Sequence, residues 1–303
     1  MSVRAAGSLR TYLVTRLLLV IPNIFILVTL VFLLMRVAPG DPIGAALGGQ
    51  LSEAELASRR AEAGYDEPLI LQYLQYLGNV FTLDFGETLT DRRDVTQIFL
   101  TNGGATLTLT LSALVIALVL GLPLGLLAGR KRDSATDASL RVLGILTYAA
   151  PVFFLGLIFQ LIFSGWLGWL PSGTQASPIN QARVEERTNI FLLDALLDGD
   201  PESFIDGLEH LVLPAITLGL LLTGVFLRMV RVNTIQTLRS DYVEAARARG
   251  VPERRVVVHH AFRNAMAPFI TVLGLQIALL MGGAVLTEET FSWPGVGSEL
   301  VRY

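Results

Sequence analysis

Five long apolar segments constrain what this 303-residue chain can fold into. The first, 17–35, holds 19 uncharged residues between Arg16 and Arg36. At a rise of about 1.5 Å per residue, a helix of this length covers roughly 28 Å, close to the ~30 Å hydrocarbon core of a bilayer. The other four segments lie within 105–129, 142–165, 211–230 and 264–287. This pattern predicts an all-α, polytopic membrane protein with five spans.

The composition excludes several kinds of chemistry. Only 16% of the residues are charged, against about 25% in a typical soluble domain. Cysteine is absent, so no disulfide, thiol nucleophile or cysteine metal site is possible. The three histidines do not have the spacing of a metal site, and no metal site is predicted. Lys131, the one lysine, lacks the glycine pattern of a P-loop. We therefore expect neither catalysis nor a bound cofactor.

Charged residues alternate in sign between successive loops. The regions 1–16, 130–141 and 228–263 together carry 15 basic and 5 acidic residues. The regions between them, 36–104 and 164–210, with the end at 288–303, carry 8 basic and 21 acidic residues. Loops rich in Lys and Arg stay in the cytoplasm. We therefore expect a multi-pass protein of the plasma membrane whose N-terminus lies in the cytoplasm.

The predicted spans contain few polar groups. Gly121, Gly125 and Gly129 recur every four residues, a spacing that lets two helix backbones approach closely. The alternative is that they are merely tolerated in a helix bent at Pro123. Gln160 and Gln276 are candidates for lining a passage, although a hydrogen bond between helices is the more usual role of such residues.

Two external helices are also expected. Residues 51–64 predict a short polar helix that begins after Ser52 and ends at Gly64. A second segment contains an apolar stripe of four leucines, Leu192, Leu193, Leu196 and Leu197. This helix could lie along the membrane interface or pack over the ends of the spans. The sequence does not choose between these two arrangements.

The segment 241–269 is basic and helix-forming between two apolar segments. Asp241 and Glu244 stand near the start of its first helix and arginines near the end, which complements the helix dipole. Gly250 suits the left-handed position after that helix, and Pro252 suits the first turn of the next. Charge alone leaves open whether the segment binds anionic headgroups or a protein.

The order of residues in this segment resembles the EAA signature of permeases in binding-protein-dependent ABC importers. The chain is most similar to the dipeptide, oligopeptide and nickel group of that family. The resemblance extends over nearly the whole chain, through RVAPGDP, LGWLPSGT, HLVLPAITLGL, DYVEAARARGV, RNAMAPFITVLGLQ and FSWPGVG.

The resemblance implies a type-1 ABC importer transmembrane fold. Residues 1–104 would form a cytoplasmic tail, the first span and an external segment, and 105–303 the core domain with a coupling helix at about 241–258. A sixth span would follow FSWPGVG, so we expect the natural chain to continue past Tyr303. The resemblance assigns docking onto an ATPase to six residues: Asp241, Tyr242, Glu244, Ala245, Ala246 and Gly250.

The implied partners are a second permease subunit, two cytoplasmic ATPase subunits that use ATP and Mg²⁺, and an external substrate-binding protein. Dipeptides or oligopeptides are the expected substrates, with nickel or another small solute as the alternative. A membrane scaffold or sensor that transports nothing is the alternative from another class.

Overall fold

The computed structural model describes residues 9–36, 44, 52–62, 64–88, 90–282 and 284–302. Its secondary structure is helical in these residues, apart from one isolated bridge between Glu87 and Asp94. The chain divides into two compact units at Gln97 and Ile98, whereas the sequence placed a boundary after residue 104. The Pro-Gly-Asp-Pro motif at 39–42 lies outside the described residues.

The first unit contains α1 (Leu9–Arg36), α3 (Glu53–Glu62) and α4 (Leu69–Thr82). Most apolar side chains of α1 are not covered by other residues of this unit, and the helix is long and apolar enough to cross a membrane. Its end is held to α4 by a hydrogen bond of 2.7 Å between Thr29 Oγ1 and the Tyr73 hydroxyl. Phe32 is buried there, between the rings of Tyr73 and Tyr76.

Helix α3 begins as the sequence predicts. The Glu55 backbone N–H donates to Ser52 Oγ at 3.4 Å, and the Ser52 N–H donates to Glu55 Oε2 at 2.8 Å. This reciprocal pair is a capping box. Gly64, after the helix, has a φ of +70°, a conformation that glycine adopts without strain.

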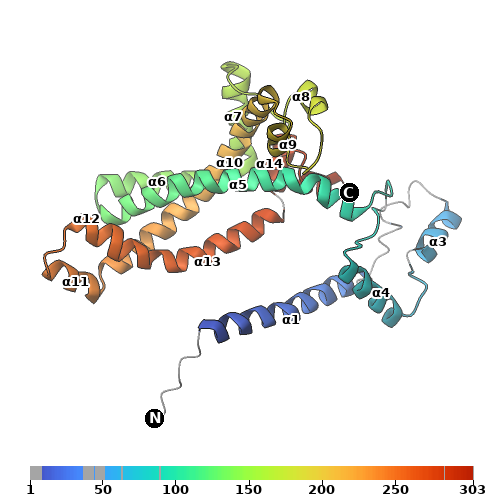
Figure 1. Ribbon diagram of the computed structural model, residues 1–303, viewed down its shortest axis with the longest axis horizontal. Coiled ribbons are helices and arrows are strands. Elements are labelled where there is room, and N and C mark those ends of the chain that lie inside the picture. Colours follow the sequence, from blue (N-terminus) through green and yellow to red (C-terminus); the bar gives the residue numbers. More distant parts are fainter. Residues whose placement is uncertain are drawn as a thin grey trace, which may run out of the picture. The chain divides into compact units, whose positions relative to one another are not determined.

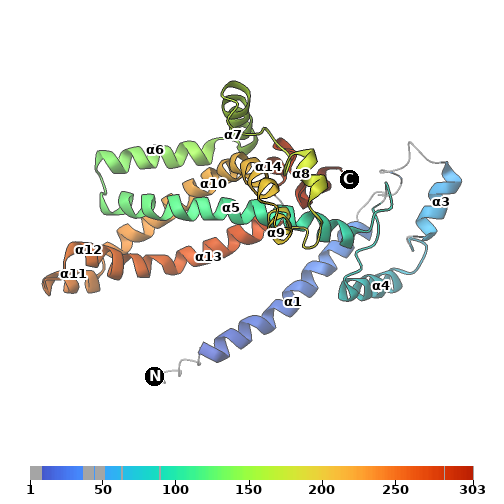
Figure 2. The ribbon, with the colours of Figure 1, turned by 45° about the horizontal axis from the view of Figure 1, so that its top comes forward.

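The second unit is built on three long helices, α5 (Val95–Arg130), α10 (Pro201–Leu238) and α13 (Phe262–Met281). Helices α6 (Ala135–Ala149) and α13 both pack against α10, and α10 crosses α5 obliquely (Figures 1 and 2). Helices α1, α5 and α10, and the continuous stretch Glu253–Met281, are each long and apolar enough to cross a membrane. The predicted multi-pass membrane fold is confirmed.

The third predicted span is not one straight helix. Helix α6 is followed by α7 (Val152–Phe159) and a π-helical segment, η1 (Gln160–Trp166), with a bend of 98° between them. The bend falls at Ala150 and Pro151, where Ala150 is extended with a ψ of 131°. A residue before proline avoids the helical region, so the break follows from the sequence. Pro214, by contrast, lies inside the continuous α10.

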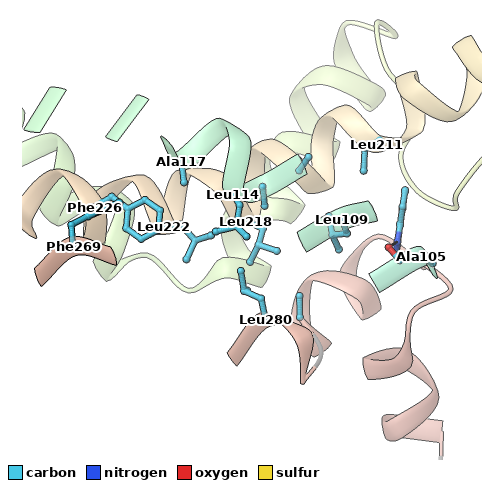
Figure 3. Packing of buried hydrophobic residues seen from close by; sticks show 14 of the residues in the cluster. Ala105, Leu109, Leu114, Ala117, Leu211, Leu218, Leu222, Phe226, Phe269 and Leu280 are labelled. Carbon is cyan, nitrogen blue, oxygen red and sulfur yellow. Dashed lines mark hydrogen bonds between the residues drawn. The ribbon is translucent and has the colours of Figure 1, made fainter. Parts of the chain in front are cut away.

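The glycine spacing of α5 serves close packing, as predicted. A Cβ added at Gly121 would lie 2.8 Å from Phe226 Cβ, and one at Gly125 would lie 2.7 Å from Val230 Cβ. At Gly129 it would lie 2.8 Å from Thr234 Cβ. Beside this contact, α5, α10 and α13 enclose the main core (Figure 3). That core includes Leu109, Leu114, Leu218, Leu222, Phe226 and Phe269.

Short helices gather at the end of the bundle away from α11 (Figures 1 and 2). They are α8 (Pro178–Arg183), α9 (Phe191–Leu197), α14 (Val285–Thr290) and α15 (Val296–Arg302). Helix α9 packs against α10, since a Cβ at Gly207 would meet Phe191 and Leu192 within 2.9 Å. Leu193, Leu196 and Leu197 stay exposed. The four leucines therefore do not form one stripe, and α9 combines packing with an exposed apolar face.

Candidate coupling and passage sites

Helix α11 (Asp241–Ala248) projects from the end of the bundle with α12 (Glu253–Arg255), beyond the C-terminal end of α10 (Figures 1 and 2). The sequence predicted two short helices separated by a turn here, and the structure has them. Pro252 is the cap residue before α12 and not its first helical residue. The helix continues from α12 through a π-helical segment, η2 (Val256–Ala261), into α13.

The turn after α11 has the geometry of a Schellman motif. The Gly250 N–H donates to Arg247 O at 2.9 Å, and the Val251 N–H donates to Ala246 O at 3.2 Å. Gly250 has a φ of +74°. These two bonds and the left-handed glycine define the motif, so Gly250 ends α11 for the reason the sequence indicates.

One side of α11 is anchored to the rest of the unit. Val243 and Ala246 are buried with Val256 of η2 and with Ala261. The small cluster is completed by Leu238 at the end of α10 and by Val251. Since η2 continues directly into α13, α11 contacts the span that follows it through this apolar cluster.

An ion pair holds the turn from outside. Arg247 donates to Glu253 through Nε at 3.0 Å and through Nη2 at 2.7 Å. The hydrogen bond to Glu253 raises the pKa of Arg247 further above its ordinary value. A two-bond arginine–carboxylate contact fixes orientation as well as distance. The pair therefore ties the last turn of α11 to the first residue of α12.

The six residues assigned by the resemblance do not all lie on one surface. Five of them are exposed: Asp241, Tyr242, Glu244, Ala245 and Gly250. Ala246 is only 1% exposed and packs beneath the helix. Its side chain holds α11 on η2 and does not belong to the outward surface. Sequence reasoning missed Val243, the other anchor, although its spacing of three from Ala246 places both on one helix face.

A buried ion pair joins α6 and α10 in the half of the bundle nearest α11. Arg231 donates to both carboxylate oxygens of Asp137, through Nε at 2.6 Å and Nη2 at 2.7 Å. The Asp137 side chain is fully buried, and that of Arg231 is 17% exposed. The sequence placed both residues in cytoplasmic regions but gave no sign that they meet.

A cavity of about 870 Å³ lies beside this ion pair, among α6, α10 and α13. Arg141, Arg228 and Arg231 line it, together with mostly apolar residues. Neither glutamine that the sequence proposed for a passage is among the lining residues. Gln160 Nε2 donates to Ser172 O at 2.5 Å and to Thr290 O at 2.9 Å. Gln276 is half-buried on α13.

The segment FSWPGVG packs against α5 at the end of the bundle opposite α11. Trp293 is buried, and its indole Nε1 donates to Ala105 O at 2.9 Å. Glu288 is also buried and accepts from Thr106 Oγ1 at 2.8 Å and from the Ser298 N–H at 3.0 Å. Burial raises the pKa of Glu288 above its ordinary value. Sequence analysis did not single out this carboxyl group, which lies outside the candidate spans.

Comparisons with known proteins agree with this architecture. Residues 121–302 match the family model for the inner membrane component of binding-protein-dependent transport systems. Residues 9–91 match the model for the N-terminal part of such components.

Relatives match over nearly the whole chain. The di/tripeptide transport system permease protein DppB of Pseudomonas aeruginosa is 41% identical over 292 residues, 96% of this chain and 86% of the relative. The dipeptide permease protein DppB of Escherichia coli K12 is 36% identical with the same coverage. The glutathione permease protein GsiC of Salmonella paratyphi A is 33% identical over 290 residues, 96% of this chain and 85% of the relative. This chain belongs to the family of inner membrane permease components of binding-protein-dependent transport systems.

Proposed function

We propose that this chain is a permease subunit of an ATP-driven importer for dipeptides or other short peptides. The names of its relatives support the peptide substrate. The observation that carries the coupling role is the construction of α11. It presents Tyr242, Glu244 and Ala245 outward, while Val243 and Ala246 fasten it to η2 and so to α13.

The energy for import would come from partner subunits. The sequence has no P-loop, so ATP and Mg²⁺ would bind to two cytoplasmic ATPases. A second permease would complete the passage, and an external binding protein would deliver the peptide. The basic residues of 130–141 and 228–263 support a cytoplasmic location for α11 and for the N-terminus.

The contacts of α11 suggest how a force on it reaches the spans. Its anchor cluster contains Leu238 from the end of α10 and Val256 at the start of η2. The pair of Arg247 with Glu253 keeps the turn between α11 and α12 from opening. A displacement of α11 would therefore move the ends of α10 and α13 together. An ATPase that contacts α11 differently with and without ATP would bias the permease between two conformations.

The test compares two alanine-to-tryptophan substitutions in the complete transporter in proteoliposomes. Ala245 is exposed on α11, and Ala138 is exposed on α6 near the same end of the bundle. Ala245→Trp should abolish uptake of radiolabelled dialanine by obstructing the docking surface, while Ala138→Trp should leave it close to wild type. Glu244→Trp should uncouple the transporter, so that ATP hydrolysis continues while dialanine uptake is lost.

Normal uptake by both α11 variants would refute the coupling assignment. Absence of dialanine uptake by the wild-type transporter, with ATP hydrolysis intact, would refute the peptide substrate. Uptake of nickel or another small solute in that situation would favour the alternative importer. A chain that assembles with no ATPase at all would favour a scaffold or sensor.

A further inference from the structure

The cavity among α6, α10 and α13 has a charge distribution that the coupling role does not explain. Its wall is mostly apolar and includes Ile145, Tyr148, Val225 and Val272. Arginine side chains from the basic regions 130–141 and 228–263 also face it. Cationic groups therefore stand beside an apolar wall in this cavity.

Two of these arginines lie at the same level of the bundle. Helices α6 and α10 are antiparallel, because Asp137 meets Arg231 while Gly144, later in α6, lies near Leu227 and Gly224, earlier in α10. Arg141 follows Asp137 by four residues, and Arg228 precedes Arg231 by three. Each therefore stands about one helical turn from the ion pair, on the same side of it.

The ion pair leaves Arg228 without a counter-charge and Arg141 with only a distant one. Both oxygens of Asp137 are already bound by Arg231 at 2.6 and 2.7 Å. Arg141 reaches Asp137 only at 4.0 Å, and its side chain is 53% exposed. Arg228 is exposed to the cavity and has no hydrogen-bond or ion-pair partner among the residues that the structure describes. The cavity thus has two cationic groups that can bind an anion.

We propose that this cavity binds the terminal carboxylate of a peptide in transit, held by Arg228 and Arg141, with the peptide's side chains against the apolar wall. Guanidinium groups match a carboxylate with two parallel hydrogen bonds. The volume of about 870 Å³ is within the range of small-ligand sites, about 300–1,000 Å³. This proposal rests on the peptide-import function above and adds a substrate site to it.

The test uses the complete transporter in liposomes of phosphatidylcholine alone, with Arg228→Gln, Arg228→Lys and a control, Arg132→Gln. Arg132 is paired with Asp133 in the α5–α6 loop and does not line the cavity. Arg228→Gln should lower dialanine uptake about tenfold, the scale of one lost charged hydrogen bond. Arg228→Lys should recover most of the uptake, and Arg132→Gln should match wild type.

A photoreactive dipeptide locates the site directly. A dipeptide that contains benzoylphenylalanine and a free carboxylate should crosslink to the segment around Tyr148 or Val225 in the wild-type transporter. The crosslink should disappear in Arg228→Gln and should be absent with the carboxyl-amidated form of the same probe.

Each contrary outcome has a distinct meaning. Equal uptake and crosslinking in wild type and Arg228→Gln would overturn the site while leaving peptide import intact. A defect of Arg228→Gln that occurs only in liposomes with phosphatidylglycerol would assign the arginines to a lipid headgroup. Dissociation of the Arg228→Gln complex on size-exclusion chromatography would assign them to subunit contact. If the wild type takes up no dipeptide, the proposed function fails before any variant is compared.

Discussion

Replacing Gly125 by alanine tests the contact between α5 and α10 on which the bundle is built. The added Cβ would lie 2.7 Å from Val230 Cβ and 2.8 Å from Leu227 O. The shorter distance is about 0.7 Å less than the 3.4 Å at which ordinary contact begins. Both neighbours are rigid parts of α10, so the two helices must separate to admit the methyl group.

The magnitude follows from two opposing effects. Forcing an extra carbon into a packed contact costs about 1–3 kcal/mol, and replacing glycine in a helix gains about 0.5–1 kcal/mol. We expect a net loss of about 1–2 kcal/mol for Gly125→Ala. Gly103 is the matched control, since it lies in the same helix and a Cβ there has nothing within 4 Å. Gly103→Ala should therefore be neutral or stabilising.

The assay is thermal unfolding of the purified chain in one detergent, followed by tryptophan fluorescence. At roughly 2–4 °C per kcal/mol, Gly125→Ala should unfold about 2–8 °C below wild type, while Gly103→Ala should unfold at or above it. Equal shifts for the two variants would show that the glycines of α5 act through backbone flexibility and not through close packing.

Three further outcomes are expected. Asp137→Leu leaves the guanidinium of Arg231 without its counter-charge and should destabilise the chain by about 3–5 kcal/mol. The double variant Asp137→Leu with Arg231→Met should recover much of this loss in thermal unfolding; losses of the two single variants that simply add in the double variant would argue against a direct pair. Because burial raises the pKa of Glu288, the folded state binds this proton more tightly than the unfolded chain does. The resulting stability is present below the pKa of the unfolded carboxyl group and is lost as the pH rises through the raised pKa of the folded state. The melting temperature of the wild type, relative to Glu288→Gln, should therefore fall as the pH rises above the ordinary carboxyl range; a constant difference would contradict this. Gly250→Ala places a side chain at a φ of +74° with open space around it, so its cost is about 1–2 kcal/mol of backbone strain. Limited proteolysis at the end of α11 should increase, while the melting temperature of the bundle should change little.

Local sequence signals account for several elements in detail. The capping box at Ser52 and the left-handed Gly250 depend on neighbours only a few residues away, so their geometry follows from residue type. The break at Pro151 is of the same kind, yet its 98° bend was not predicted, because local sterics end a helix without setting the direction of the next one.

Other features depend on residues that are distant in the chain. Ala246 looks like part of a docking surface until η2 and its Val256 cover it. The sequence leaves Gln160 open to lining a passage or to a hydrogen bond between helices, and its amide donates to the carbonyl oxygens of Ser172 and Thr290. In both cases residue type alone does not fix the role of the side chain, because that role depends on which distant residues it contacts.

The sequence by itself determined that the chain spans a membrane several times and where α11 ends, because apolar length and glycine placement act locally. Only the tertiary structure decided that Asp137 neutralises Arg231 and leaves Arg141 and Arg228 facing a cavity, and that Glu288 is buried beneath the FSWPGVG segment. Burial and pairing of charges are properties of packed helices, and residues as far apart as 137 and 231 acquire them only when those helices meet.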